Sequence, residues 1–273
     1  MNKKNIIIKK SFPFIASFFA LLGCSNDEKQ TVTTMNQLVM QDEFDVDGAP
    51  NNALWGFDIG KGPNGDGWGN NELQYYSNRP ENVKVLDGVL QITAQKELYL
   101  GSQYTSAKIL SKGKFSKKHG RFEARIKMPW GQGLWPAFWL LGSNIDEVGW
   151  PKCGEIDIME YRGQQPTVTN VALHGPGYSG GNAISKSYTL VNDRFDTDFH
   201  IFGVEWGENY INFYVDAVLF KQFTPKDVTG EWVFENPFYM ILNLAVGGSY
   251  VGPPNNETSF PQTMYVDYVR VYQ

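Results

Sequence analysis

The sequence predicts an all-β protein in which two curved antiparallel sheets form a sandwich. From residue 39 onward, short runs rich in β-branched and aromatic residues alternate with turns rich in Gly, Asn and Asp. No segment keeps the apolar period of a helix over three turns. Many short strands without helices are typical of a sandwich or barrel. Aromatic residues make up 15% of the chain, more than a core needs, which indicates rings that line a cleft.

Turn signals and alternation locate the individual strands. Asp87 and Gly88 separate the runs 82–85 and 89–94, which predicts a two-residue hairpin. Further strands are expected at 121–128, 137–141, 199–206, 210–215, 218–223, 240–246 and 264–272. No linker or repeat interrupts this pattern, so residues 39–273 are predicted to form one domain.

The first 24 residues have the features of an export signal. Four lysines precede the apolar run 12–22, which is too short for a retained membrane helix. The segment ends in Leu21, Leu22, Gly23 and Cys24, which resembles a bacterial lipoprotein signal with Cys24 as the lipid-bearing residue. The alternative is an ordinary secretory signal in which Cys24 has no role. Under the first interpretation, the mature protein is anchored to the outer membrane of the cell envelope.

Residues 25–38 are polar and are expected to form a tether. Its first acidic residues, Asp27 and Glu28, resemble signals that send lipoproteins to the outer cell surface. Removal of residues 1–24 would change the formal net charge from −5 to −9, which argues against a nucleic-acid partner. The remaining Cys153 has no disulfide partner and is expected to be a small packing residue, and the protein is expected to be a monomer.

Three carboxylates, Glu155, Asp157 and Glu160, lie within one apolar run. Side chains of a strand alternate between faces, so Glu155 and Asp157 share a face and Glu160 should point into the core. A β-bulge near residues 158–159 would return Glu160 to the face of the other two. The Glu155 and Glu160 α-carbons would then be about 13 Å apart. Their carboxyl groups would be about 5 Å apart, the separation of a retaining glycosidase pair.

The alternative is a strand with a solvated acidic face. Ile156 and Ile158 argue against it, because they have the pattern of a buried face on the same strand. Three acidic side chains on the other face would also repel one another unless they held something.

These carboxylates, together with the segments 67–76, 134–141 and 263–272, resemble glycoside hydrolase family 16 in its bulge-containing form, and within it the laminarinases. The resemblance implies a β-jelly-roll with a cleft across its concave sheet. It also implies endo-hydrolysis of β-1,3-glucans with retention of configuration and no cofactor for the chemistry. Glu155 would be the nucleophile and Glu160 the acid and base, while Asp157 would tune their protonation.

Other polar and aromatic residues are candidates for binding the sugar. Trp130 and Trp135 are expected to be cleft platforms, whereas Trp139 is expected to pack in the core. His174 ends the strand after the catalytic one and could reach Glu160, or it could be structural.

The loop before the predicted hairpin adds two further candidates. Asn70 and Arg79 could donate hydrogen bonds to sugar hydroxyls, or could belong to an ordinary surface loop. Glu72 in the same region is expected to be a structural hydrogen-bonding residue.

The resemblance also implies a structural calcium ion, far from the chemistry. Its ligands would be Glu43, the carbonyl group of Gly88 and Asp267, and oxygen ligands are those that calcium prefers.

Three functions remain open at this point. The first is a laminarinase, and the second is a β-1,3-1,4-glucanase or a galactan hydrolase of the same family. The third is a glucan-binding surface lipoprotein without activity, since jelly rolls serve both roles. The intact set of three carboxylates argues against the third.

Overall fold

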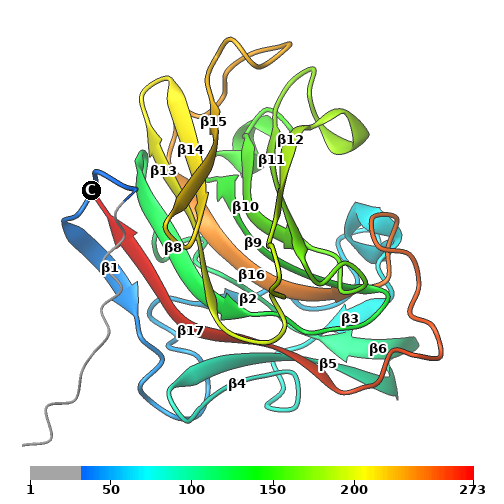
Figure 1. Ribbon diagram of the computed structural model, residues 1–273. Helices are drawn as coiled ribbons and strands as arrows, with labels where there is room; N and C mark the ends of the chain where they lie inside the picture. The colour runs from blue at the N-terminus through cyan, green and yellow to red at the C-terminus, as the bar shows by residue number, and fades with distance from the viewer. Residues whose placement is uncertain (1–31) are drawn as a thin grey trace, which may run out of the picture.

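The computed structural model describes residues 32–273, which form a sandwich of two curved β-sheets (Figure 1). The predicted signal peptide, the lipidation site Cys24 and the first part of the tether lie outside the described residues. Within residues 32–273, no helix is long and apolar enough to cross a membrane.

The first sheet has ten strands in the order β15-β14-β13-β8-β17-β5-β6-β3, with β1 added to β17 and β4 to β5. Its strands are β1 (Leu38–Asp42), β3 (Gln74–Tyr76), β4 (Val83–Leu86), β5 (Val89–Tyr99), β6 (Ser102–Ser106), β8 (Gly120–Lys127), β13 (His200–Gly207), β14 (Tyr210–Val215), β15 (Val218–Phe223) and β17 (Gln262–Tyr272).

The second sheet has seven strands in the order β12-β11-β10-β9-β16-β7-β2. Its strands are β2 (Gly56–Phe57), β7 (Lys108–Leu110), β9 (Leu134–Gly142), β10 (Glu155–Tyr161), β11 (Val168–His174), β12 (Ile184–Thr189) and β16 (Phe238–Val246). The helical segments are short: α1 (Ile145–Val148), a π-helical segment (Gly67–Asn71) and a 3₁₀ helix (Gly180–Asn182).

The predicted all-β sandwich is confirmed, and it has the two-sheet form of a jelly roll. The hairpin between β4 and β5 is also confirmed, because Leu86 pairs with Val89 and both turn residues, Asp87 and Gly88, have positive φ. One pairing departs from the antiparallel prediction: β3 and β6 are parallel.

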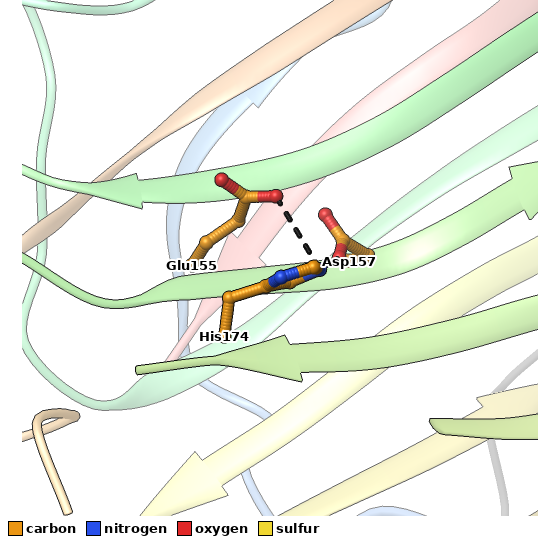
Figure 2. Close-up of side chains that lie close together, drawn as sticks. All are labelled: Glu155, Asp157 and His174. Carbon is orange, nitrogen blue, oxygen red and sulfur yellow. Dashed lines mark ion pairs between the residues drawn. The ribbon is translucent and has the colours of Figure 1, made fainter. Parts of the chain in front are cut away.

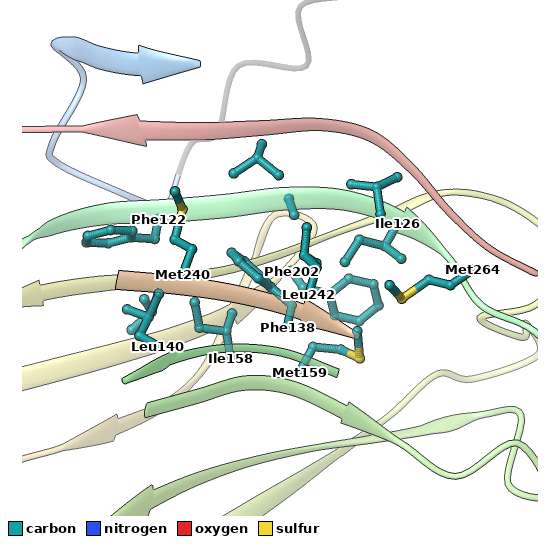
Figure 3. Close-up of a cluster of buried hydrophobic side chains, with 14 of the residues drawn as sticks. Phe122, Ile126, Phe138, Leu140, Ile158, Met159, Phe202, Met240, Leu242 and Met264 are labelled. Atoms are coloured by element: carbon teal, nitrogen blue, oxygen red, sulfur yellow. The ribbon is translucent and has the colours of Figure 1, made fainter. Parts of the chain in front are cut away.

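The main core lies between the two sheets (Figure 3). Alternate residues of each strand point into it, which is the period-2 rule of a sheet buried on one face. On β8 these are Phe122, Ala124 and Ile126, and on β9 they include Phe138 and Leu140. The other residues of these strands therefore occupy the outer faces, where the candidate site is found.

The predicted tether is shorter than expected, because its last residues are bound to the domain. The backbone N–H groups of Thr34 and Met35 donate to one carboxylate oxygen of Glu205, at 2.6 and 2.8 Å, and the Thr34 hydroxyl donates to the other oxygen at 2.8 Å. Gln37 and Gln273 exchange backbone hydrogen bonds of 3.0 and 2.9 Å. The buried carboxylate of Glu205 thus binds the end of the polar segment, and nothing in the sequence around Thr34 predicts this contact.

Candidate active site

A β-bulge at Ile158 brings the three carboxylates of β10 onto one face. Asp157 is opposite Trp139 of β9, whereas Met159 is already opposite the next partner, Phe138. Two steps along β10 therefore match one step along β9, as the sequence predicted. The bulge lets Ile158 and Met159 both enter the core, and Glu160 turns outward with Glu155 and Asp157. We call this outer face of the seven-stranded sheet the catalytic face.

His174 contacts this cluster from the neighbouring strand β11, where it is opposite Glu155. Its Nε2 atom lies 2.9 Å from Asp157 Oδ2 and 3.7 Å from Glu155 Oε1 (Figure 2). The sequence led us to expect a contact with Glu160, and this expectation is wrong: the strand register places His174 at the Glu155 end of β10.

Two indole groups donate hydrogen bonds to the cluster. Trp135 Nε1 donates to Glu160 Oε1 at 3.2 Å, and Trp150 Nε1 donates to Glu155 Oε2 at 2.9 Å. Trp135 comes from β9, whereas Trp150 lies in the loop between α1 and β10 and is 48% exposed. Each glutamate is thus held by an aromatic side chain that borders the catalytic face.

Burial and mutual repulsion raise the proton affinity of the cluster. Burial, with the negative charge of Asp157 second, raises the pKa of Glu155 to about 8, and the same two causes raise the pKa of Glu160 to about 8. Burial lowers the pKa of His174, but the charge of Asp157 and its contact with the ring raise it more, so the net change is upward. The groups titrate together, and the cluster keeps protons at neutral pH.

An aromatic wall stands beside Glu160. The ring of Tyr250 packs on Trp135 with centroids 4.9 Å apart, and the guanidinium of Arg162 lies 4.0 Å from the Tyr250 ring centre. Asn170, opposite Glu160 on β11, donates to the Tyr250 hydroxyl at 2.8 Å. These contacts fix the Trp135 indole that holds Glu160.

A second polar network lies on the other side of the carboxylates. Trp139 was expected in the core, but it lies on the catalytic face, and its Nε1 donates to Asn243 Oδ1 at 2.8 Å. Asn243 in turn donates to the Tyr76 hydroxyl at 3.2 Å, which donates to Glu72 at 3.2 Å. The predicted structural role of Glu72 is thus confirmed, and Asn70 joins the network by donating to Glu72 at 3.1 Å.

Comparison with known proteins agrees with this arrangement. The model of the glycosyl hydrolases family 16 matches residues 70–270. The chain belongs to glycosyl hydrolase family 16. A β-glucanase of Rhodothermus marinus is 39% identical over 265 residues, which cover 93% of this chain and 91% of that protein.

Two solved structures extend the likeness to three dimensions. The endo-β-1,3-glucanase of Pyrococcus furiosus superposes with a TM-score of 0.83 at 46% identity, over 86% of this chain and 94% of that one. The laminarinase catalytic domain of Thermotoga maritima gives a TM-score of 0.83 at 48% identity, over 87% of this chain and 98% of that one.

Two of the predicted sugar-binding residues of this family 16 domain are not brought to the carboxylates. The guanidinium of Arg79 is paired with Glu97 and lies 4.1 Å from the ring centre of Tyr99, so its contacts are those of a structural residue. Trp130 is 45% exposed, and its ring contact is with Arg194 at 5.8 Å rather than with the cluster.

The residues predicted to bind calcium do not fit that ion. Both carboxylate oxygens of Glu43 accept from Arg270, at 2.8 and 2.9 Å. Asp267 is paired with Arg125 at 2.8 Å. Each carboxylate is already neutralised by a guanidinium, which a calcium site would have to displace. The expectation of a structural calcium ion at this place is therefore not supported by the donor set.

Glu155, Asp157 and His174 offer three ligand atoms within 4.8 Å of one another, close enough to hold a metal ion. The second nitrogen of His174 does not suit one, however. A metal-binding histidine normally donates its other ring N–H to an acceptor. Here Nδ1 instead accepts a hydrogen bond of 3.1 Å from the backbone N–H of Gly180. The cluster is arranged to hold protons rather than a metal ion.

Sequence reasoning missed Trp150 and Tyr250. Trp150 lies five residues before Glu155, between Gly149 and Pro151, so a turn directly before the catalytic strand was a usable signal. Tyr250 reaches the site from the loop after β16, and nothing in its local sequence indicates that contact.

Proposed function

We propose that this family 16 protein is an endo-acting, retaining hydrolase of β-1,3-glucans. The observation that carries the proposal is the bulge at Ile158, which gathers Glu155, Asp157 and Glu160 on one face with a separate donor on each glutamate. The similar solved structures from Pyrococcus furiosus and Thermotoga maritima are a β-1,3-glucanase and a laminarinase, which supports this substrate class.

The hydrogen bonds suggest which glutamate loses its proton first. The indole donor of Glu155 lies at 2.9 Å and that of Glu160 at 3.2 Å, and only Glu155 also has the His174 ring within ion-pair distance, at 3.7 Å. Donors stabilise the ionised form of a carboxyl group, so Glu155 is the better anion. Glu160 keeps its proton near neutral pH, as a general acid must.

The reaction then follows the double displacement of retaining glycosidases. A Glu155 oxygen attacks the anomeric carbon while Glu160 transfers its proton to the glycosidic oxygen, and the leaving sugar departs. Glu160, now ionised, takes a proton from water, and the resulting hydroxide attacks the same carbon and releases Glu155. Asp157 keeps the two glutamates from ionising together, and this maintains the asymmetry that the first step needs.

Aromatic side chains at both ends of the cluster suit a neutral sugar chain. Trp150 and Trp135 each combine a ring face with an N–H that is already committed to a catalytic carboxylate. Rings of this kind pack on the C–H faces of pyranoses. A sugar bound against either ring would thus contact the side chain that orients the reacting group.

The test is reducing-sugar release by a soluble domain without residues 1–24 on laminarin, lichenan, barley β-glucan, agarose and carrageenan. We expect fast release from laminarin, lost by several orders of magnitude in Glu155→Gln while oligosaccharide binding is kept. Release only from lichenan or barley β-glucan would identify a β-1,3-1,4-glucanase, and release only from a galactan would identify a galactan hydrolase. Binding without release from any substrate would identify a glucan-binding protein and refute the proposal.

We also propose that Cys24 carries a lipid that anchors the enzyme in the outer membrane. The sequence of residues 1–24 is the support for this proposal. Expression of the full chain in a bacterial host with labelled palmitate should give a labelled, membrane-bound protein. The Cys24→Ser variant should be unlabelled, and equal labelling of both would exclude this anchor.

A further inference from the structure

His174 has different partners at its two ring nitrogens. Nδ1 accepts a hydrogen bond of 3.1 Å from the backbone N–H of Gly180. Nε2 lies 2.9 Å from an Asp157 oxygen and 3.7 Å from a Glu155 oxygen, and Figure 2 shows the three side chains converging. A backbone N–H can only donate, so Nδ1 carries no hydrogen while this bond is made. The neutral ring therefore has its hydrogen on Nε2, toward the carboxylates.

The Gly180 amide belongs to a loop with an anchored base. Just after β11, Gly175 and Tyr178 exchange two backbone hydrogen bonds of 3.0 Å. Tyr178 is buried, and its hydroxyl donates to the carbonyl of Glu231 at 2.7 Å. Gly180 follows two residues later with a φ of 57°, a left-handed conformation that favours glycine. The exposed tip of the loop thus contacts the catalytic cluster through one hydrogen bond from a fixed base.

We propose that the Gly180–His174 hydrogen bond is a latch that sets the protonation of the catalytic cluster, with His174 as a positioning residue for Glu155 and Asp157. The proposal rests on the proposed function of these carboxylates, but the latch itself takes no part in bond cleavage. While the latch is closed, the ring is neutral and its Nε2 hydrogen lies on the side of Asp157, whose Oδ2 is 2.9 Å from Nε2. A second proton would bind at Nδ1. The N–H formed there would point at the Gly180 N–H, and two donors repel each other. His174 becomes an imidazolium only when the loop tip moves away.

The groups around the ring make both states accessible. The three carboxylates of β10 draw a second proton to His174, and burial of the ring opposes it. The loop before β10 contributes the uncharged indole of Trp150, whose ring centre is 5.9 Å away. On β12, Lys186 is opposite Val171 and therefore on the other face of the sheet from His174. The Gly180 amide is accordingly the polar contact that favours the neutral ring.

The protonation state can be measured by ¹⁵N NMR of protein labelled at its three histidines, with His174→Gln used to assign the signals. Burial lowers the pKa of His174, but the charge of Asp157 raises it more, to about 9, so at pH 10 we expect an unprotonated Nδ1 and a protonated Nε2. Gly180→Pro removes the amide hydrogen and, because proline cannot keep the φ of 57°, also moves the loop tip, so it opens the latch and should raise the pKa of His174 by about one unit or more. The matched control is Gly181→Pro, because no hydrogen bond of the Gly181 amide is found in residues 32–273, and it should leave this pKa unchanged. A protonated Nδ1 at pH 10 in the unmodified protein, or equal pKa values in both variants, would overturn the proposal.

Kinetics on laminarin provide a second readout. His174→Leu removes the Nε2 donor, and we expect kcat to fall at least tenfold with KM within threefold. The acid limb of kcat/KM should move to higher pH, because the positive charge that His174 carries when it takes up its second proton favours the ionised forms of Glu155 and Glu160. His174→Gln keeps an N–H donor and should recover part of the loss. A purely structural role would leave the limb in place and contradict the proposal. The NMR result needs no substrate, so the predicted ring state in a protein without glucanase activity would refute the function and support the latch.

Discussion

Buried carboxylates occur on both outer faces of the sandwich, but in opposite surroundings. On the catalytic face, Glu155, Asp157 and Glu160 lie together, and the one basic side chain paired with them in the described chain is His174. On the outer face of the ten-stranded sheet, which we call the back face, Glu205 lies opposite Arg121 on the neighbouring strand. The first arrangement concentrates negative charge, whereas the second compensates it.

Both glutamates of the back face that lie beside Arg121 have partners. Glu205 accepts three hydrogen bonds from Thr34 and Met35. Glu123 accepts from the Tyr214 hydroxyl at 2.6 Å and lies 3.4 Å from Arg121 Nε. The Arg121 guanidinium is also centred 3.6 Å from the ring centre of Tyr272. Buried charges that are paired and hydrogen-bonded in this way hold a structure together.

The comparison shows that burial alone does not determine what a carboxylate does. On the back face, the hydrogen bonds that Glu205 accepts hold the N-terminal segment against the domain. On the catalytic face too few opposite charges leave protons on the cluster at neutral pH, which is what acid catalysis requires but which costs stability. Four changes would break or sharpen this contrast.

The largest effect is expected from Glu160→Gln, which removes the acid but keeps its shape. Turnover of laminarin should fall by about 10²–10⁴-fold, the usual contribution of a positioned general acid. A substrate whose leaving group needs no proton, such as an aryl glycoside, should lose much less. Equal losses on both substrates, measured by initial rates, would show that Glu160 is not the acid.

Removal of the N-terminal segment tests the back face. A chain that begins at residue 38 loses all three donors to Glu205, and we expect its free energy of unfolding to fall by about 2 kcal/mol. A chain that begins at residue 32 keeps them and is the matched control. Urea denaturation measures both, and equal midpoints would mean that the segment does not stabilise the domain.

The pH dependence tests the catalytic face. The pKa of Glu160, raised to about 8, keeps the acid protonated below that pH, so kcat/KM should fall about tenfold per pH unit above it. The stability of the folded protein should also fall as pH rises. The folded protein binds more protons than the unfolded chain between the ordinary glutamate pKa and about 8, so the unfolding free energy contributed by the cluster falls as pH rises. Activity that stays constant to pH 10 would contradict the raised pKa.

The part of the site that the sequence predicted depends on local spacing. The bulge followed from a conflict between strand alternation and three acidic residues, and the hairpin followed from Asp87 and Gly88. Other features were not predicted, because they depend on loop geometry or on contacts between separate segments. These are the contact of Trp150 with Glu155, the docking of Thr34 on Glu205, and the pairing of Arg79 with Glu97. Thr34 and Glu205 are 171 residues apart, and no local pattern reports such a contact.

The predicted contact between His174 and Glu160 was wrong for a related reason. The position of His174 at the end of a strand was correct, but its partner depends on the register between β10 and β11. The bulge shifts that register by one residue between Asp157 and Glu160. A residue beyond the bulge therefore faces a different carboxylate from one before it, and the two cannot be distinguished without the pairing.

The most direct test applies the same chemical change to both faces. Glu155→Gln and Glu205→Gln each exchange one buried carboxylate for an amide of nearly the same shape, and thermal unfolding at pH 8 compares them. Glu155→Gln should raise the melting temperature, because it removes a carboxyl group whose ionisation is opposed by burial and by the negative charge of Asp157. Glu205→Gln should lower it, because an amide group cannot accept the bonds from Thr34 and Met35 at both ends. Destabilisation by both substitutions, to a similar extent, would contradict the contrast between the two faces.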